Sequence, residues 1–144
     1  AYGYSDTRIF DAPYFVDNDR FSVEANRLRP ERAALRARWD IPEDALCFLF
    51  AGKLESKKRP LDLLNALDQA ARSGVRVHGL VVGSGELQNE ARALADQRGI
   101  PVSFAGFLNQ SQIPEAYAAA DALVLTSDYR ETWGLVVNEG MVNG

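Results

Sequence analysis

The sequence predicts an α/β protein with a Rossmann-like, doubly wound parallel sheet, and three features of its 144 residues indicate this fold class. From residue 45 onward, short apolar runs alternate with stretches that have the spacing of amphipathic helices. The first run, residues 46–51 (LCFLFA), is apolar throughout, as in a strand that is buried on both faces. Glycines follow the first two runs at Gly52 and Gly83, where a strand would give way to a loop. Strands that alternate with helices form βαβ units, which build a parallel sheet covered by helices on both sides.

Residues 1–44 are expected to form an interdomain segment that leads into the sheet domain of residues 45–144. Residues 8–15 (RIFDAPYF) are β-prone, and their proline limits them to an edge strand or a linker. Residues 17–19 (DND) match the D-x-D pattern of metal-dependent sugar transfer, but they precede the sheet and are interpreted as a turn. Residues 30–39 begin with a proline and contain alanines and arginines, which predicts a short helix.

The sheet domain is expected to contain four strands, each followed by a helix. The strands are expected at residues 46–51, 75–82, 102–105 and 122–125, and the helices at residues 60–72, 86–98, 114–120 and 135–143. In a sheet of this kind, ligands bind outside the carboxyl ends of the strands. This rule selects the loops at residues 52–59, 83–86, 106–112 and 127–134.

The composition is that of an ordinary globular domain, with 47% hydrophobic and 25% charged residues. The net charge of −4 gives no reason to expect nucleic acid or an acidic membrane surface as a partner. The single cysteine, Cys47, cannot form an internal disulfide and indicates a reducing compartment. The sequence contains no signal peptide and no apolar run near the roughly 18 residues of a membrane span, so a cytoplasmic protein is expected.

The first selected loop carries four cationic residues within seven positions after Gly52. Lys53 and Lys58 bracket this loop and are expected to lie close enough to bind one polyanion. The alternative is a basic loop that is merely solvated. The phosphate-binding pattern G-x-x-x-x-G-K-[ST] is missing, so the loop is not a P-loop.

The second selected loop (VVGSGELQNE) contains part of a dinucleotide-binding fingerprint. Gln88 stands where the third glycine of that fingerprint would be, and no acidic residue closes a following strand. A nicotinamide-binding domain is therefore disfavoured. Gly83 and Gly85 are interpreted as residues that let the loop run close beneath a ligand.

The last selected loop and the helix after it carry two carboxylates, Glu131 and Glu139. Gly134 and Leu135 open the helix, and the unpaired N–H groups of a helix N-terminus favour an anion. Carboxylates accept hydrogen bonds from vicinal hydroxyls, as in a sugar or a ribose. The alternative is that Glu139 is an ordinary partner of the helix dipole and Glu131 is a solvated loop charge.

Other reactive side chains have no partners in the sequence. Cys47 lies in an apolar run and is expected to be a buried thiol. His78 lies inside a predicted strand with no second His or Cys nearby, so a core or surface histidine is favoured over a metal ligand. No Ser-His-Asp arrangement and no metal-ligand cluster is visible, so no metal and no cofactor are expected.

Four segments occur in the order and at the spacing of a known family. Gly52-Lys53-Leu54 with Lys58 matches its G-[RK]-L…K element, and Glu131-x7-Glu139 matches its E-x7-E motif. The segments VVGSGE and FAGFLNQSQIPEAYAAAD look like those that the family has in between. Over nearly its whole length, the chain resembles the C-terminal donor-binding domain of group 1 glycosyltransferases (family 4, GT-B fold).

The resemblance implies that Lys53 and Lys58 bind the diphosphate of a nucleotide-sugar, with UDP, GDP or ADP as the nucleotide. There the lysines would offset the negative charge that develops on the leaving group, a task that a metal performs in other enzymes. Backbone amides near Gly134, Leu135 and Val136 would add a helix N-terminus to this diphosphate site. Members of the family retain the anomeric configuration and need no metal.

The resemblance also assigns the remaining parts of a nucleotide-sugar. Glu131 would bind hydroxyls of the donor sugar, Glu139 would bind the ribose diol, and the loop at Phe107 and Leu108 would face the base. The sequence departs from the family pattern at Thr132-Trp133, where Gly-Phe is common and which would reshape the sugar pocket while keeping an aromatic side chain. Lys53 stands where arginine is commoner, which exchanges a bidentate fork for a point charge.

Both ends of the sequence look interrupted, so the chain is expected to be a segment of a larger protein that also has an N-terminal acceptor domain. The acceptor is unknown, and peripheral contact with a membrane is conceivable for the larger protein. The segment alone is expected to bind a nucleotide weakly and not to transfer sugar. Its open sheet edge could self-associate.

Two other classes stay open at this point. A nucleotide-sugar epimerase of GT-B shape would need acid and base carboxylates in a different arrangement from E-x7-E. A non-catalytic, flavodoxin-like signalling or binding module would cluster acidic residues at the end of the first strand, where this chain has Lys53, Lys57 and Lys58.

Overall fold

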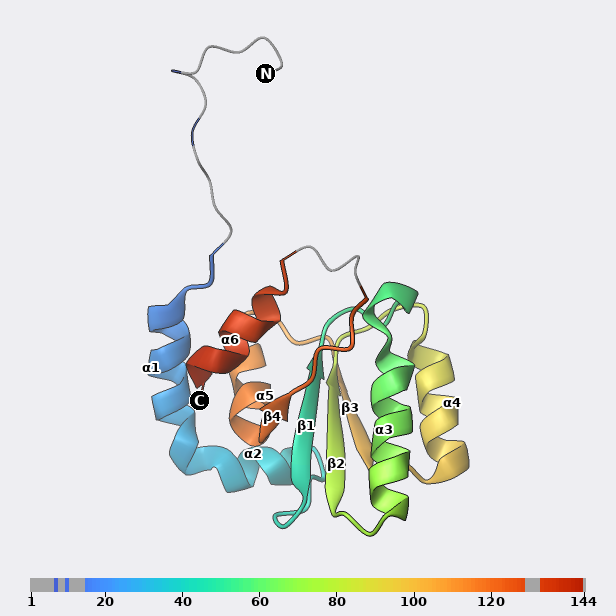
Figure 1. Cartoon of the computed structure of the whole chain (residues 1–144). Helices are drawn as coiled ribbons and strands as arrows, with labels where there is room; N and C mark the ends of the chain where they lie inside the picture. The colour runs from blue at the N-terminus through green and yellow to red at the C-terminus, as the bar shows by residue number, and fades with distance from the viewer. Residues whose placement is uncertain (1–6, 8–9, 11–14, 129–132, 144) are drawn as a thin grey trace.

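The computed structural model describes residues 7, 10, 15–128 and 133–143, and within them the centre is a parallel sheet of four strands (Figure 1). The strands are β1 (Leu46–Ala51), β2 (Val77–Val82), β3 (Val102–Gly106) and β4 (Ala122–Leu123), in the spatial order β3-β2-β1-β4. The α-helices are α1 (Asn18–Leu28), α2 (Arg32–Arg38), α3 (Pro60–Arg72), α4 (Gln88–Arg98), α5 (Ile113–Ala119) and α6 (Leu135–Asn143), and the short 3-10 turns are η2 (Arg29–Glu31) and η3 (Ser56–Lys58). The predicted α/β class with parallel strands is confirmed.

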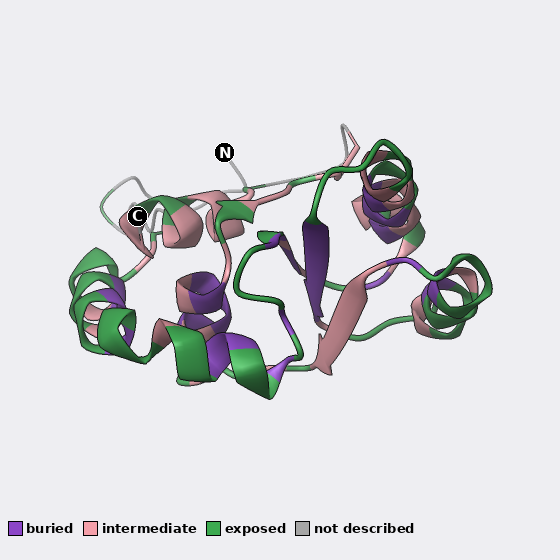
Figure 2. Cartoon of the chain, turned by 90° about the horizontal axis from the view of Figure 1, so that it is seen from below, coloured by how far each residue is buried: buried purple, intermediate pink, exposed green. Residues whose placement is uncertain are grey.

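The apolar strands bury both faces of the sheet. Every residue of β2 is buried, whereas β3, at the edge of the sheet, is only partly buried (Figure 2). Successive side chains of β1 point to opposite faces: Leu49 joins a core with α1, α2 and α5, and Phe50 joins a core with α3 and α4. Helices therefore cover both sides of the sheet (Figure 1), and the doubly wound arrangement is confirmed.

Helix α1 corrects the turn expected at residues 17–19. Asp17 is the N-cap of this helix, and its side chain accepts a hydrogen bond from the backbone N–H of Arg20 at 3.1 Å. The buried side chains Phe21, Ala25 and Leu28 then repeat at helical spacing. The turn interpretation is wrong because Asp and Asn favour helix caps as much as turns, and the apolar spacing that follows decides between them.

Several boundaries also differ from the prediction. β2 begins at Val77 instead of residue 75, and β4 covers Ala122–Leu123 instead of residues 122–125. Helix α4 begins at Gln88 instead of residue 86, and the backbone N–H of the preceding Leu87 donates to the Leu54 carbonyl at 2.9 Å. The extended segment expected at residues 8–15 lies mostly outside the described residues.

A cluster of arginines closes the amino end of the sheet. Arg36 of α2 is 4% exposed and donates to the carbonyls of Pro42 and Ala45 and to a carboxylate oxygen of Asp121. Asp121, just before β4, also accepts from Arg32 at 2.6 Å and from the backbone N–H of Cys47 at 2.7 Å. We call Arg32, Arg36 and Asp121 the arginine cluster; it ties α2, β1 and the start of β4 together.

Cys47 is a core residue, as the sequence predicted, and so is His78, for which the sequence left a core or a surface position open. Ser103 of β3 donates to the Trp39 carbonyl at 2.5 Å, so its oxygen is left to accept a hydrogen bond from His78 Nε2 at 2.9 Å. Burial, with a smaller contribution from the Arg36 charge, lowers the pKa of His78. Burial raises the pKa of the Cys47 thiol to about 11, so Cys47 is a packing residue and not a reactive thiolate.

Candidate functional site

A pocket of about 530 Å³ lies where β1, β2 and β3 end and α6 begins, and we call it the main pocket. Eight of its lining residues are positions that the sequence selected: Gly52, Lys53, Gly83, Gly85, Phe107, Leu108, Val136 and Glu139. Its other lining residues are Ala51, Val82, Ser84, Gln110 and Ile113. Loops that are far apart in the sequence therefore converge at the carboxyl edge, where a parallel sheet binds ligands.

Two glycines allow the loops after β1 and β2 to lie against each other. Gly83 has φ +127°, and a Cβ atom on it would lie 1.9 Å from the Gly52 carbonyl oxygen. A Cβ atom on Gly85 would lie 2.4 Å from the Leu54 carbonyl oxygen. The backbones are joined by the Leu54 N–H, which donates to the Ser84 carbonyl at 3.0 Å. The glycines thus make the close approach of two backbones possible, and both line the main pocket.

Of the two lysines that were expected to bind one polyanion, Lys53 lines the main pocket and Lys58 does not. Lys53 is exposed and lines the main pocket, and no carboxylate among the described residues forms an ion pair with it. Lys58 belongs to the η3 turn and does not line this pocket. Its carbonyl oxygen accepts from the Thr126 hydroxyl at 2.7 Å, so Lys58 lies beside the chain that follows β4. Lys53 and Lys58 thus flank different parts of the same sheet edge.

Glu139 enters the main pocket from α6. It is half-buried, and its Oε2 accepts a hydrogen bond from the Tyr117 hydroxyl at 2.8 Å. Gly134 precedes this helix with φ +56°, and its carbonyl accepts from the Val137 N–H at 2.9 Å, so the helix opens at the predicted position. Trp133, 61% exposed, precedes Gly134.

Other predicted site residues lie elsewhere or cannot be placed. Leu135 is in the first turn of α6, but it does not line the main pocket, and neither do Trp133 and Gly134. Glu131 and Thr132 lie outside the described residues.

The loop after β3 forms one wall of the main pocket and exposes an aromatic ring. Phe107 is 76% exposed, and Leu108 and Gln110 line the pocket beside it. Asn109 shapes the loop as an Asx turn, because its Oδ1 accepts from the N–H groups of Ser111 and Gln112. The loop is held from outside by Arg20 of α1, which donates to the Gln110 carbonyl at 2.8 Å and to its side-chain oxygen at 3.0 Å.

Sequence reasoning missed three contributors to this site: Gln110, Arg20 and Tyr117. Gln110 lies in a loop that the sequence did select, so the position was available and only the side chain was overlooked. Arg20 and Tyr117 act from α1 and α5, and their partners are 90 and 22 residues away in the chain. Contacts at such separations are set by tertiary packing, and no local pattern signals them.

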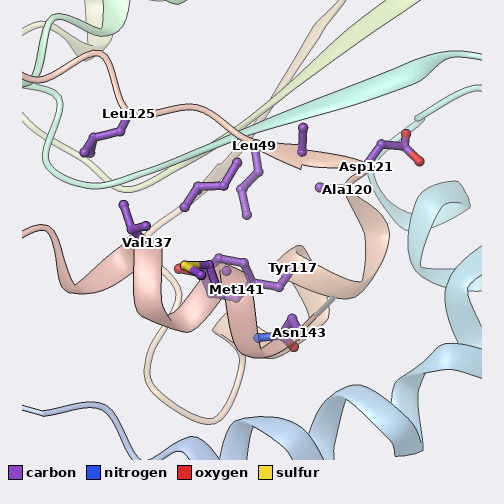
Figure 3. A pocket seen from close by; sticks show the side chains of 11 residues that line it. Leu49, Tyr117, Ala120, Asp121, Leu125, Val137, Met141 and Asn143 are labelled. Atoms are coloured by element: carbon purple, nitrogen blue, oxygen red, sulfur yellow. The ribbon is translucent and has the colours of Figure 1, made fainter.

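A second, smaller pocket of about 310 Å³ lies between β4 and α6, and we call it the edge pocket (Figure 3). Its walls are mainly apolar and include Leu49, Leu125, Val137 and Met141. Tyr117 also lines it, while the hydroxyl of the same residue contacts Glu139 of the main pocket. One side chain therefore links the two pockets.

The side chains of the main pocket differ in chemistry. Lys53 offers a positive charge to an anion, and Glu139 offers carboxylate oxygens to hydroxyl groups. The exposed Phe107 ring offers a face on which a planar group can stack. No group of three or more His, Cys, Asp or Glu side chains that could hold a metal ion occurs within the described residues. No helix in that part of the chain is long and apolar enough to cross a membrane.

Comparison with known proteins identifies the family of this chain. The family model for group 1 glycosyl transferases matches residues 31–144. A D-inositol 3-phosphate glycosyltransferase of Streptomyces scabiei is 38% identical to this chain, across 91% of this chain and 33% of that protein. A second one, from Streptomyces avermitilis, is 40% identical across 85% of this chain and 29% of that protein. The chain thus spans about one third of the length of the curated relatives it matches.

Solved structures have the same fold. The crystal structure of WaaG, a glycosyltransferase involved in lipopolysaccharide biosynthesis, superposes with a TM-score of 0.63 at 26% identity, across 78% of this chain and 30% of that chain. A glycosyltransferase from Rickettsia africae superposes with a TM-score of 0.75 at 21% identity, across 99% of this chain and 38% of that chain. Because the family match takes in well over half of its residues, the chain belongs to the group 1 glycosyltransferases.

Proposed function

We propose that this chain is the donor-binding half of a retaining, metal-independent glycosyltransferase with a GT-B fold. The reaction transfers a sugar from a UDP-, GDP- or ADP-sugar to an acceptor. The single observation that carries the proposal is the main pocket, where Lys53, Glu139 and Phe107 come together at the carboxyl edge of the sheet. A cation suits the diphosphate of a nucleoside diphosphate, a hydroxyl acceptor suits its ribose, and an aromatic face suits its base.

In this proposal, positive charge replaces a metal at the diphosphate. Lys53 binds the diphosphate from the main pocket, and Lys58 approaches it from the η3 turn beside the chain after β4. The N-terminus of α6 at Gly134, Leu135 and Val136 adds backbone N–H groups that favour an anion. When the bond to the sugar breaks, negative charge grows on the diphosphate, and fixed positive groups stabilise that charge most at this moment. This is the role we assign to both lysines.

The other parts of the donor bind to groups on either side of the diphosphate. Glu139 accepts hydrogen bonds from the ribose diol, and the loop of Phe107 and Leu108 contacts the base. Glu131 accepts from hydroxyls of the donor sugar, with Thr132 and Trp133 shaping that end of the site. The order base, ribose, diphosphate, sugar then runs along the carboxyl edge, from the end of β3 to the start of α6.

An acceptor domain supplies the rest of the enzyme in this proposal. The isolated chain binds nucleotide weakly and does not transfer sugar, so detectable transfer by it would contradict the assignment of donor half. We place the enzyme in the cytoplasm. We also propose that the isolated chain self-associates through β4, whose Ala122 is exposed at the edge of the sheet.

Calorimetry of the full-length protein with UDP, GDP and ADP, and with their sugar derivatives, tests the site. Glu139→Ala and Lys53→Ala are each expected to weaken binding by about tenfold, equivalent to ~1.4 kcal/mol, whichever sugar is attached. Lys58→Ala should weaken binding of the diphosphates and leave that of a nucleoside unchanged.

The matched control is Lys57→Ala. Lys57 lies in the same loop, but its ammonium group pairs with Glu55 at 3.4 Å. The Lys57→Ala variant should therefore bind nucleotide as the unmodified protein does. Unchanged affinity in both Glu139→Ala and Lys53→Ala would overturn the proposed donor site.

A further inference from the structure

We infer that Tyr117, supported by α1, is a positioning residue that fixes the Glu139 carboxylate for recognition of the ribose diol. The inference rests on the role proposed above for Glu139. It adds a residue from α5 that does not line the main pocket, and it gives α1, a helix that precedes the first strand, a part in nucleotide affinity.

The contact between Tyr117 and Glu139 is short and largely shielded from water. Tyr117 is 7% exposed, and its hydroxyl lies 2.8 Å from Glu139 Oε2. Figure 3 shows the Tyr117 side chain directed from α5 toward α6, at the edge pocket. Its ring packs edge-on against Phe21 of α1, with centroids 6.1 Å apart and planes at 81°. The ring is therefore held in place, and the hydroxyl has a fixed position.

The proton of this hydrogen bond belongs to the tyrosine. Burial, the charge of Glu139 and the hydrogen bond itself raise the pKa of Tyr117 well above its usual value. The hydroxyl therefore stays protonated and donates to Glu139 Oε2. A carboxylate has two oxygens and about four acceptor positions, so Oε1 and the second lone pair of Oε2 remain available to a ligand.

A carboxylate that is already held in one position loses less conformational entropy when the ligand binds. A glutamate has three side-chain torsions, and fixing a rotamer-rich side chain at a binding site costs about 0.5–1.5 kcal/mol. Tyr117 restricts these torsions before the ligand arrives. A ribose diol then meets acceptors that already point in one direction, so Tyr117 contributes to affinity without touching the ligand.

Helix α1 supports the main pocket at two adjacent residues. Phe21, 1% exposed, packs on Tyr117, and Arg20 beside it donates to Gln110 in the loop after β3. The guanidinium of Arg20 also lies 4.5 Å from the centre of the Phe21 ring, which couples the two contacts. The same turn of α1 thus steadies the wall expected to bind ribose and the wall expected to bind the base.

The test compares UDP with 2′,3′-dideoxy-UDP, which lacks the diol, in the full-length protein. In the unmodified protein, removal of the diol should weaken binding by about tenfold. In Tyr117→Phe, which keeps the ring and removes only the hydroxyl, UDP should bind about threefold to fivefold more weakly, while dideoxy-UDP should bind as before. The ratio of the two dissociation constants should therefore fall to about two to three. A purely structural role for Tyr117 would weaken both ligands equally and leave this ratio unchanged.

Two further variants separate failure of this inference from failure of the proposed function. If Glu139→Ala abolishes discrimination of the diol while Tyr117→Phe retains the full ratio, the donor site stands and the positioning role is overturned. If Glu139→Ala also retains the full ratio, the role proposed for Glu139 is itself wrong. Should Tyr117→Phe fail to fold, Phe21→Leu decides: loosening the ring should lower the ratio about twofold, and an unchanged ratio would overturn the inference.

Discussion

The two ends of the sheet use charged side chains in opposite ways. At the amino end, the buried guanidinium of Arg36 is bonded to two carbonyls and to Asp121, which also accepts from Arg32 and from the Cys47 N–H. At the carboxyl end, Lys53 is exposed and lines a pocket. At the amino end, charged side chains stabilise the fold by pairing with one another and with carbonyls. At the carboxyl end, the charged group of Lys53 remains exposed in a pocket.

The difference has a physical consequence for mutations. A buried charge whose partner is removed destabilises the folded state, because desolvation is no longer offset. An exposed charge costs little when it is removed, and its loss shows only when a ligand of opposite sign binds. Changes at the amino end should therefore lower the free energy of unfolding, and changes at the carboxyl end should raise the dissociation constant for a nucleotide.

The largest effect is expected for Arg36→Leu at the amino end. The change removes the donor to the carbonyls of Pro42 and Ala45 and one of the two donors to Asp121 Oδ2, which keeps the Cys47 N–H. We expect the free energy of unfolding in urea to fall by about 3–5 kcal/mol, while the folded fraction binds UDP normally.

The matched control for that prediction is Arg72→Leu. Arg72 also pairs with an aspartate, Asp68, but its side chain is 68% exposed. Its loss should cost less than about 1 kcal/mol. Equal effects of Arg36→Leu and Arg72→Leu would show that the arginine cluster contributes no more than a surface ion pair.

Gly83→Ala is expected to lower both the free energy of unfolding and the affinity for a nucleotide, because a close contact between two backbones lies inside the main pocket. The new Cβ would lie 1.9 Å from the Gly52 carbonyl oxygen, at a φ of +127° that side chains rarely adopt. We expect a loss of about 3 kcal/mol in unfolding free energy together with weaker UDP binding.

Gly74→Ala is the control for Gly83→Ala. Gly74 also has positive φ (+84°), but no atom lies within 4 Å of its would-be Cβ. The Gly74→Ala variant should lose only about 1 kcal/mol of unfolding free energy to backbone strain, and it should bind UDP normally. If Gly83→Ala behaved like Gly74→Ala, the close approach of the two loops would not be needed for the site.

The sequence was sufficient to predict the strands and most of the pocket. Buried parallel strands must be continuously apolar, and glycines mark where they end, so Gly52, Gly83 and Gly85 could be selected locally. The sequence assigned Gly83 and Gly85 to the approach of a ligand, and only the structure shows that a second backbone lies against them. The rule that ligands bind at the carboxyl edge selected the loop that contains Phe107, whereas the roles expected of Phe107 and Glu139 came from the family resemblance.

The remaining features depend on tertiary packing or on ambiguous local signals. Helix α1 was missed because Asp17 suits a turn and a helix cap equally well. The sequence put Lys53 and Lys58 in one loop but did not reveal the η3 turn, whose residue Lys58 accepts from the Thr126 hydroxyl through its carbonyl. The Tyr117–Glu139 contact joins residues 22 positions apart on two helices whose relative placement no spacing reveals.

A smaller effect is expected from pH at the amino half of the sheet. His78 is the only histidine of the chain, and burial lowers its pKa in the folded state. Arg36 lowers that pKa further, while Asp40 opposes the shift. Below a pH of about 6.5, the unfolded chain binds a proton at His78 that the folded state does not, so the unfolding free energy falls as the pH falls.

We expect this loss to stay below about 1.4 kcal/mol per pH unit, measured in urea between pH 7 and pH 5.5. His78→Gln should flatten the curve in this window and leave UDP affinity at pH 7 unchanged. The lowered pKa of Asp121 acts at a more acidic pH, because its carboxylate loses its charge below the usual aspartate range. An unchanged slope in His78→Gln would show that His78 is protonated equally in both states.

The smallest effect is expected for Lys53→Arg at the carboxyl end. Both side chains carry one positive charge, but a guanidinium can contact two diphosphate oxygens at once, whereas an ammonium acts as a point charge. We expect calorimetry to show about threefold tighter UDP binding, with the unfolding free energy unchanged within about 0.5 kcal/mol. Lys57→Arg, in the same loop but paired with Glu55, should change neither quantity. If Lys53→Arg left the affinity unaltered, the side chain at this position would not contact two diphosphate oxygens at once, and the ligand-binding half of the contrast between the two ends would rest on the loss of affinity in Lys53→Ala.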